Sequence, residues 1–377
     1  MTVYAYYDAD TDARVYHVIP SPDSSPSEFT FESESDSAAS GVTIESDDLP
    51  GYFVVRHGRP QPAGDNAAQW FPSDNTRRYI LQSLVSKWVF GGEYIGPVQE
   101  MLAPVPGRER QALELGTRSG TWIQAMATEF PHVRFRTLDI IPMVAHTPRA
   151  NVVFEVYDFQ EGLMVPDESQ DVVFLNVVLE IVSRTPVECG LELIKNPWLK
   201  VKDYRALLRE VHRVLRPGGL IYINDFNPHI WDPEDPTKRA QRNPLGCRIS
   251  DLVREYIINM GIDPDTCDKL PEWLTPDSDL WDQAKEPKGF EQIRSVTRTY
   301  PAHPHPGYPC MDVVDPRITP FLGHLTIQST RDIFPLLKDG GMTDEAAGEL
   351  VEGVIDELKQ HERCMRLKLY CVYAVKR

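Results

Sequence analysis

The sequence lacks any hydrophobic run long enough to span a bilayer, although the chain has 377 residues and a hydrophobic content of 41%. Its first residues, Met1-Thr2-Val3-Tyr4, contain no basic segment followed by an apolar one, so no secretory leader is predicted. A membrane partner is therefore not expected. The cytoplasm is the expected compartment, with the nucleus as the alternative if the protein is a regulator.

Clustered cysteines and clustered basic residues are also missing. The six cysteines occur singly and none forms a Cys-x-x-Cys pair, so neither a metal site nor a disulfide framework is predicted. No dense run of Lys and Arg is present, and the net charge is −17. Because phosphate binding depends on clustered basic side chains, nucleic acid is not an expected partner.

Basic residues are entirely absent from 20–50, where nine serines and eight carboxylates occur. This composition predicts a disordered, solvated acidic segment within an N-terminal extension, 1–50. A plain linker and a segment that binds a protein partner both fit it.

The stretch 113–122, Leu-Glu-Leu-Gly-Thr-Arg-Ser-Gly-Thr-Trp, is the most informative part of the chain. A short apolar run ends at Gly116, Gly120 follows four residues later, and Trp122, Met126 and Phe130 continue at helical spacing. Strand, glycine turn and helix together predict a place where a ligand lies against bare backbone at a helix N-terminus.

Apolar strands and helical patterns alternate from residue 111 onward, which predicts an α/β fold with a parallel sheet covered on both faces. The expected strands are 111–115, 133–138, 152–156, 171–175, 219–224, one starting near 290, and 367–375. The expected helices are one capped by Asp74 or Ser73, a short one near 101, 204–215, 247–260, 327–338 and 343–362. A hairpin is expected over 3–18, and loops over 228–246 and 301–316. The Pro/Asp-rich stretch that runs to about 288 is given no element.

Acidic residues follow two of the expected strands. Asp139 lies 19 positions beyond Gly120 and suits the two hydroxyls of a ribose, or else a helix cap. Asp158 suits an exocyclic adenine amine, with Phe159 or Ile140 against the base, or else a turn. The spacing Gly-x-Gly-x-x-Gly of NAD sites and the Gly-Lys-Ser/Thr of Walker loops are both absent. S-adenosylmethionine (SAM), which has no phosphate, fits this pattern better than either.

On these residues the chain resembles the class I SAM-dependent methyltransferases. Leu113–Gly120 is similar to their first motif, Leu138–Ile140 to the ribose-binding loop, and 157–159 to the adenine contact. The resemblance implies a Rossmann-like sheet of seven mostly parallel strands, whose last strand is antiparallel and lies beside the fifth. It also implies an N-terminal helical lid over 51–110, a SAM-binding core over 111–226, and substrate-covering helical insertions over 227–377.

A narrower likeness to the fungal LaeA-like and UMTA-type methyltransferases rests on Arg56–Arg59, Phe71–Asn75, Gly91–Pro97 and Glu129–Val133. It implies a fungal source and secondary metabolism. The cofactor-binding residues that the resemblance and the strand ends imply are Glu114, Gly116, Thr117, Arg118, Gly120, Asp139, Ile140, Asp158, Phe159, Asn176 and Tyr94.

Arg118 departs from the family pattern, because it replaces the middle glycine of the first motif. Three outcomes are open: the side chain points outward, it contacts the methionine carboxylate of SAM, or it weakens cofactor binding. The segment 183–202 is also longer than the pattern expects.

Catalysis leaves few sequence signals, because methyl transfer needs mainly alignment and dehydration of the acceptor. Asp225 and His229, after the fifth strand, are the candidate bases, and His303 and His305 lie in a loop that could cover the pocket. The preferred function is methylation of an oxygen or nitrogen of a small molecule, a fungal secondary metabolite. The alternatives are a LaeA-like regulator acting through protein partners, a protein methyltransferase, and a SAM-binding fold without turnover.

Overall fold

The computed structural model describes most of the chain from residue 75 onward and short parts before it. The described residues are 2–8, 13–19, 53–62, 75–142, 149–157, 159, 162–180, 204–282, 288–312 and 314–377. The acidic segment 20–50, Asp158 and the long segment 183–202 lie outside these residues.

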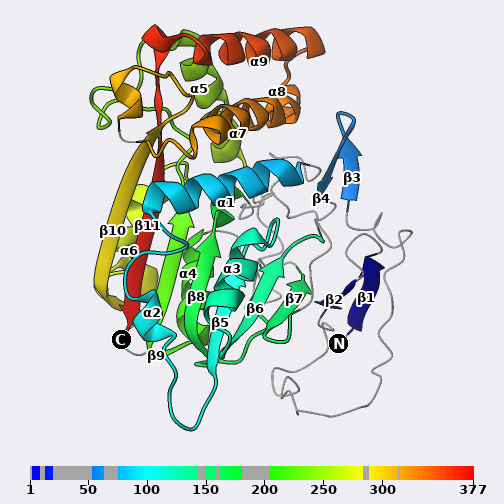
Figure 1. Ribbon diagram of the computed structural model, residues 1–377, viewed down its shortest axis with the longest axis vertical. Coiled ribbons are helices and arrows are strands. Elements are labelled where there is room, and N and C mark those ends of the chain that lie inside the picture. The colour runs from blue at the N-terminus through cyan, green and yellow to red at the C-terminus, as the bar shows by residue number, and fades with distance from the viewer. Residues whose placement is uncertain are drawn as a thin grey trace.

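Among the described residues, the main sheet contains nine strands in the order β1-β2-β7-β6-β5-β8-β9-β11-β10 (Figure 1). The strands are β1 (Thr2–Asp8), β2 (Ala13–Ile19), β5 (Arg110–Leu115), β6 (Val133–Asp139), β7 (Val152–Val156), β8 (Gln170–Asn176), β9 (Leu215–Asp225), β10 (Phe290–Pro301) and β11 (Arg366–Lys376). Strands β7, β6, β5, β8 and β9 are parallel, and β11 enters antiparallel between β9 and β10. The predicted Rossmann-like sheet of seven strands is confirmed, and the β1–β2 hairpin extends it beside β7.

The parallel register brings the carboxyl ends of the central strands together. Leu115 is paired with both Leu138 and Leu175, and Asn176 with Asn224. The residues that come directly after these strands therefore lie along a single edge of the sheet, which is where ligands bind in open α/β folds.

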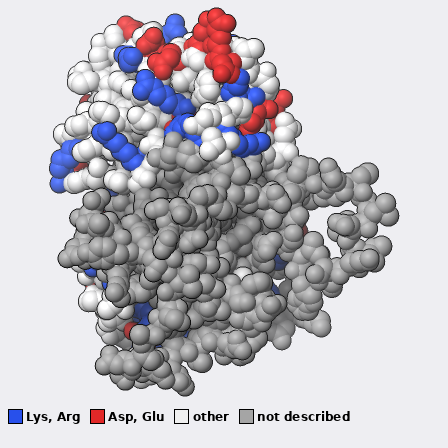
Figure 2. All heavy atoms as spheres, turned by 90° about the vertical axis from the view of Figure 1, so that its right-hand side faces the viewer, with Lys and Arg blue, Asp and Glu red and all other residues white. Residues whose placement is uncertain are grey.

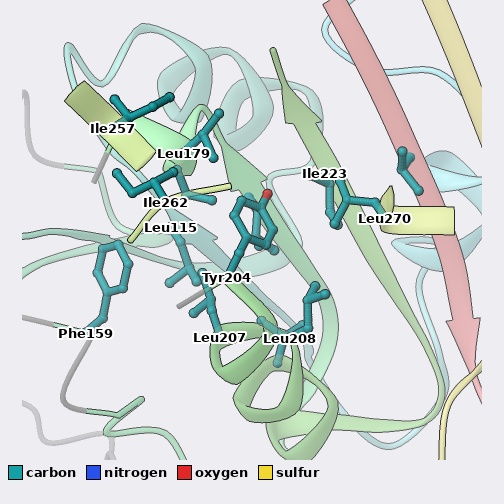
Figure 3. Close-up of a cluster of buried hydrophobic side chains, with 14 of the residues drawn as sticks. Leu115, Phe159, Leu179, Tyr204, Leu207, Leu208, Ile223, Ile257, Ile262 and Leu270 are labelled. Atoms are coloured by element: carbon teal, nitrogen blue, oxygen red, sulfur yellow. The ribbon is translucent and has the colours of Figure 1, made fainter. Parts of the chain in front are cut away.

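Successive residues of the strands enter two different hydrophobic clusters, as expected for a sheet covered on both faces. Ala112 packs with Ile123 and Met126 of α3 (Thr121–Glu129), and α2 (Val98–Met101) lies on that same face. Leu113 and Leu115 pack on the other face with α4 (Tyr204–Val214) and α6 (Thr266–Trp273), and Figure 3 shows part of this cluster.

Further helices gather beyond the carboxyl edge of the sheet, at the top of Figure 1. They are α5 (Pro244–Asn259), α7 (Thr319–Asp332), α8 (Phe334–Asp339) and α9 (Asp344–Leu358), and α1 (Thr76–Phe90) lies between α7 and the sheet. On the face shown in Figure 2, the described part of this end carries both basic and acidic side chains. No helix among the described residues is long and apolar enough to cross a membrane.

The described residues also include smaller elements. They are the hairpin strands β3 (Phe53–Arg56) and β4 (Arg59–Pro62), and the 3-10 turns Val178–Glu180, Asp279–Trp281, Pro309–Met311 and His361–Arg363.

The expected strands are confirmed to within a few residues at each end, and so is the antiparallel pairing of β11 with β9. Two predictions about the helices were wrong, and one helix was not predicted. Asn75, and not Asp74 or Ser73, caps α1, because its side chain accepts a hydrogen bond from the Arg78 backbone at 3.1 Å. Helix α6 forms in the Pro/Asp-rich stretch to which no element was assigned, despite Pro271 within it. Helix α7 begins at Thr319, eight residues before the predicted start at 327, because Pro320 at its first turn is compatible with a helix N-terminus.

Candidate functional site

The glycine turn lies between the carboxyl ends of three strands. Gly116 has a φ of +90°, and a β-carbon there would lie 2.4 Å from the backbone oxygen of Asn176 at the end of β8. The backbone amides of Gly116 and Thr117 donate to the Leu138 carbonyl of β6 at 2.9 and 3.1 Å. Gly120, with a φ of +70°, caps α3. Only glycine allows the chain to follow this path so close to β8.

Glu114 is buried at the end of β5, with 1% of its surface exposed. Its carboxylate accepts hydrogen bonds from the Thr137 hydroxyl at 2.5 Å and the Asn176 amide at 2.8 Å. The Thr137 hydroxyl is also 2.6 Å from that of Thr117. Burial raises the pKa of Glu114 to about 8, and the two hydrogen bonds oppose this rise. Glu114 thus joins the ends of β5, β6 and β8 through polar contacts.

Asp139 stands at the end of β6 against the same turn. Its carboxylate accepts hydrogen bonds from the backbone amides of Arg118 at 2.7 Å and Ile140 at 2.8 Å. Burial raises its pKa, while the Arg118 charge and these amides act in the opposite direction. Each oxygen still has accepting capacity, so the carboxylate can also bind hydroxyl groups.

Arg118 turns across the site. Its guanidinium donates to the Val177 carbonyl at 3.0 Å and lies 5.0 Å from the centre of the Tyr79 ring. Both Arg118 and Val177 have positive φ angles, 52° and 55°, which are uncommon for residues with a β-carbon. The first of the three possible outcomes, an outward side chain, is therefore not the one observed.

A small cavity of about 60 Å³ adjoins this turn. We call it the cofactor-side cavity. It is lined by Tyr79, Gln82, Ser83, Ser86, Lys87, Glu93, Glu114, Gly116, Thr117, Arg118, Ser119, Trp122, Asn176, Val177, Asn224 and Leu369. Five residues of the predicted cofactor set are therefore together at one cavity.

The other described residues of the predicted cofactor set do not line this cavity, and Asp158 lies outside the described residues. Gly120 is within the turn, and Asp139 bonds to the backbone amides of Arg118 in the turn and of Ile140. Phe159 is fully buried in the cluster on the α4 face. The Tyr94 hydroxyl bonds to Glu129 at the end of α3, and its ring packs 5.9 Å from that of Phe130.

The polar face of α1 is the part of the cavity that sequence reasoning missed. Gln82, Ser83 and Ser86 line the cavity, and Ser86 accepts a hydrogen bond from the Asn224 amide at 2.8 Å. The signal in the sequence was their helical spacing, which places Gln82, Ser83 and Ser86 on one side of α1.

A second cavity, of about 190 Å³, lies between the sheet edge and the helices beyond it. We call it the acceptor-side cavity. Most of its wall is apolar, with contributions from α1, α5, α7, α9, β10 and β11, and Phe226, Tyr300, Leu325 and Leu367 are among its residues. Gln82 and Leu369 line both cavities, so the two sites share a wall.

His229 lines the acceptor-side cavity. Its Nδ1 atom is buried and has no hydrogen-bond partner among the described residues. Its ring packs edge-on against the Trp231 ring, and the two ring centres are 4.5 Å apart. Burial lowers the pKa of His229, and the charges of Arg254 and Arg239 lower it further. The imidazole is therefore neutral near pH 7, as a general base must be.

Asp225, the other predicted base, lines neither cavity. Its carboxylate accepts hydrogen bonds from the Leu179 backbone at 3.0 Å, the Tyr204 hydroxyl at 3.2 Å and the Phe226 backbone at 2.9 Å. These contacts hold the turn after β8 against α4. Asp225 is thus placed to support the fold. His303 and His305 also lie outside both cavity walls.

Comparison with known proteins agrees with this geometry. The model of a methyltransferase domain family matches residues 88–256. The secondary metabolism regulator laeA of Coprinopsis cinerea is 26% identical over 291 residues, covering 76% of this chain and 64% of that protein. The methyltransferase str3 of Strobilurus tenacellus is 28% identical over 127 residues, covering 33% of this chain and 39% of that protein. The chain therefore spans less than two thirds of either curated relative.

Among solved structures, phosphoethanolamine N-methyltransferase 2 of Haemonchus contortus in complex with SAM aligns with a TM-score of 0.38 and 16% identity. The alignment covers 84% of this chain and 61% of that one. By its sequence matches, this chain is similar to a methyltransferase domain over 88–256 and to the laeA regulator over most of its length.

Proposed function

We propose that the chain transfers a methyl group from SAM to an oxygen or nitrogen of a small, largely apolar molecule, a fungal secondary metabolite. The observation that carries this proposal is the shared wall of the two cavities, one lined by many polar residues at the glycine turn and a mostly apolar one beyond it. An acceptor in the second cavity would approach a ligand in the first past Gln82 and Leu369.

The polar groups at the glycine turn suit the methionine end of SAM. Glu114 and Asn176 offer hydrogen-bonding groups there, and Asp139 would hold the ribose. The cavity is well below the roughly 300–1,000 Å³ of small-molecule sites, so binding would require the Arg118 side chain to leave the Val177 carbonyl. When bound, SAM would supply a methyl group made electrophilic by its sulfonium.

The residues of this chain would exclude water from the acceptor and accept its proton. Apolar walls would exclude water from the acceptor, which strengthens alignment with the methyl group. If the acceptor is a hydroxyl or a protonated amine, its proton would pass to the unpaired Nδ1 of His229. Walls drawn from helices and strands around the cavity favour a compact acceptor over an extended peptide.

A calorimetric titration with SAM tests the cofactor half of the proposal. Loss of the charge-assisted bonds to the ribose in Asp139→Ala should weaken binding by about 30- to 1,000-fold. Asp356→Ala, at an exposed acid on α9, serves as the control and should bind like the native chain. Equal SAM affinity in all three proteins would show that Asp139 does not bind SAM.

Transfer of label from methyl-labelled SAM tests the acceptor half. A panel of apolar phenols, carboxylic acids and amines should be labelled by the native chain, with kcat reduced about 10²- to 10⁴-fold in His229→Gln and SAM affinity unchanged. His324→Gln, at an exposed histidine, is the matched control. A similar rate in His229→Gln would show that no base is used there.

The similarity to the laeA regulator favours one further candidate, a regulator acting through protein partners. Labelling of proteins instead of small molecules would identify a protein methyltransferase. Tight SAM binding without transfer to either class would favour the regulator.

A further inference from the structure

A second group of chemically reactive side chains lies away from both cavities. His305 and Cys310 belong to the loop that follows β10, and Cys364 lies between the last 3-10 turn and β11. All three are buried, with 5%, 8% and 7% of their surfaces exposed. One ligand atom from each lies within 4.8 Å of the other two. We propose that His305, Cys310 and Cys364 bind a zinc ion that fixes these two segments together.

The spacing of the atoms fits such an ion. In a tetrahedral zinc site, bonds of about 2.3 Å to sulfur and about 2.0 Å to nitrogen place neighbouring ligand atoms roughly 3.5–3.8 Å apart. The Nδ1 of His305 lies 3.9 Å from the Cys310 sulfur, and the whole group is only slightly wider. A small inward movement of the three side chains would bring their ligand atoms to the spacing of a tetrahedral zinc site.

The orientation of His305 provides an independent argument. Its Nε2 lies 2.9 Å from the Leu358 carbonyl, which has no proton and can only accept a hydrogen bond. The ring proton is therefore on Nε2, and the lone pair of Nδ1 points toward the cysteines. A ring nitrogen bonded to a backbone carbonyl while the other faces the metal is the usual arrangement of zinc-binding histidines.

The ligand atoms, two sulfurs and one imidazole nitrogen, indicate which metals the site would bind. Two sulfur atoms and one imidazole suit zinc, whereas magnesium and calcium prefer oxygen ligands. Each cysteine thiol would release its proton to solvent as its sulfur binds the ion. Three protein ligands leave the fourth tetrahedral position to a water molecule.

The location gives the site a consequence for the acceptor-side cavity. Ala302 and Met365 both line that cavity, and the Ala302 backbone donates to the Met365 carbonyl at 2.9 Å. His305 follows the first of these by three residues, and Cys364 precedes the second. A bound ion would hold this part of the cavity wall in place.

The sequence conceals the site, since His305 and Cys310 are five residues apart and Cys364 is far along the chain. No Cys-x-x-Cys pair marks it. The fold alone brings the three residues together.

Metal analysis of the native chain, purified under a non-chelating reductant, incubated with zinc and passed through gel filtration, tests the proposal. About one zinc per chain should remain, and Cys310→Ser and Cys364→Ser should each lose more than about 100-fold in zinc affinity. Cys247→Ser, at a half-buried cysteine outside the group, should retain the metal.

Cobalt substitution of the native chain provides a readout that does not depend on how the variants fold. Cobalt bound by two thiolates in a tetrahedral site should give intense visible absorption and a sulfur-to-metal charge-transfer band. A folded native chain that binds SAM but retains neither zinc nor cobalt would overturn the proposal. Mass spectrometry that finds a disulfide between Cys310 and Cys364 in the reduced preparation would overturn it as well.

Discussion

The two cavities of this protein are built in opposite ways. The cofactor-side cavity is built around the turn at 114–122 and the end of β8, with α1 opposite, and most of the residues that line it have polar side chains. The acceptor-side cavity is assembled from α1, α5, α7, α9, β10 and β11, and its interior is mostly apolar. The first is centred on a local backbone path, with α1 docked against it, whereas the second is formed entirely by the docking of distant elements. A substitution at the glycine turn should therefore act through backbone strain, whereas one at the acceptor-side cavity should act through lost contacts between docked elements.

The docking behind the acceptor-side cavity rests on a buried ion cluster at Asp332, the last residue of α7. Its carboxylate accepts from Arg59 at 2.7 Å and Asn75 at 2.8 Å, and it pairs with Arg78 of α1 at 2.9 Å. The Arg78 and Asp332 side chains are only 2% and 1% exposed, and Arg78 lines the cavity. This cluster attaches α1 and β4 to α7.

Asp332→Ala should have the largest effect on stability. Removing one partner leaves the Arg78 charge buried without its carboxylate, which costs about 3–5 kcal/mol. Urea unfolding measures this loss in the free energy of unfolding. Asp315→Ala, which removes a solvent-exposed pair with Arg317, should change the free energy of unfolding far less. Similar losses in both variants would contradict the role given to the buried cluster.

The contrast also explains how much could be predicted from the sequence. Short apolar runs identified the parallel strands, and the glycine spacing at Gly116 and Gly120 located the turn. Both signals are local, because a strand or a turn is determined by its own residues. The acceptor-side wall and the group around His305 have no such signal, since their residues meet only after β10, α7 and β11 have packed.

Arg118 and Asp225 show that the direction of a side chain could not be predicted from the sequence. The sequence placed both at the right edge of the sheet, because each lies just after or at the end of a parallel strand. It did not determine which way their side chains turn. Asp225 turns to the α4 face, where Tyr204 and the Leu179 backbone satisfy it. Side-chain direction at a strand end depends on the partners that the tertiary fold provides.

Gly116→Ala should have the next largest effect, and it acts on the local path of the cofactor-side cavity. The new methyl group would meet the Asn176 backbone oxygen at 2.4 Å, in addition to the strain of a positive φ. A loss of about 2–4 kcal/mol is expected from the two costs together. Thermal unfolding measures the loss, and SAM titration should show weakened binding.

Gly107→Ala separates the two costs. Gly107 has a φ of +82°, close to that of Gly116, but no atom lies within 4 Å of the position of its β-carbon. It should lose only about 1–2 kcal/mol, the cost of the left-handed conformation. If both alanine variants lost the same amount, close approach to β8 would not be what requires glycine at 116.

Glu114 should make the stability depend on pH, and the change for each pH unit is smaller than the loss expected from Gly116→Ala. Its pKa is raised from 4.5 to about 8 by burial, so between these values the folded chain holds a proton that the unfolded chain has released. Stability should therefore fall as pH rises across this window, by about 1.4 kcal/mol per pH unit. Glu114→Gln keeps an acceptor for the Asn176 amide but cannot titrate, so its unfolding free energy should fall less steeply than that of the native chain. Parallel pH profiles from urea unfolding would mean that Glu114 is ionised when folded, and that the polar cavity is better solvated than its burial indicates.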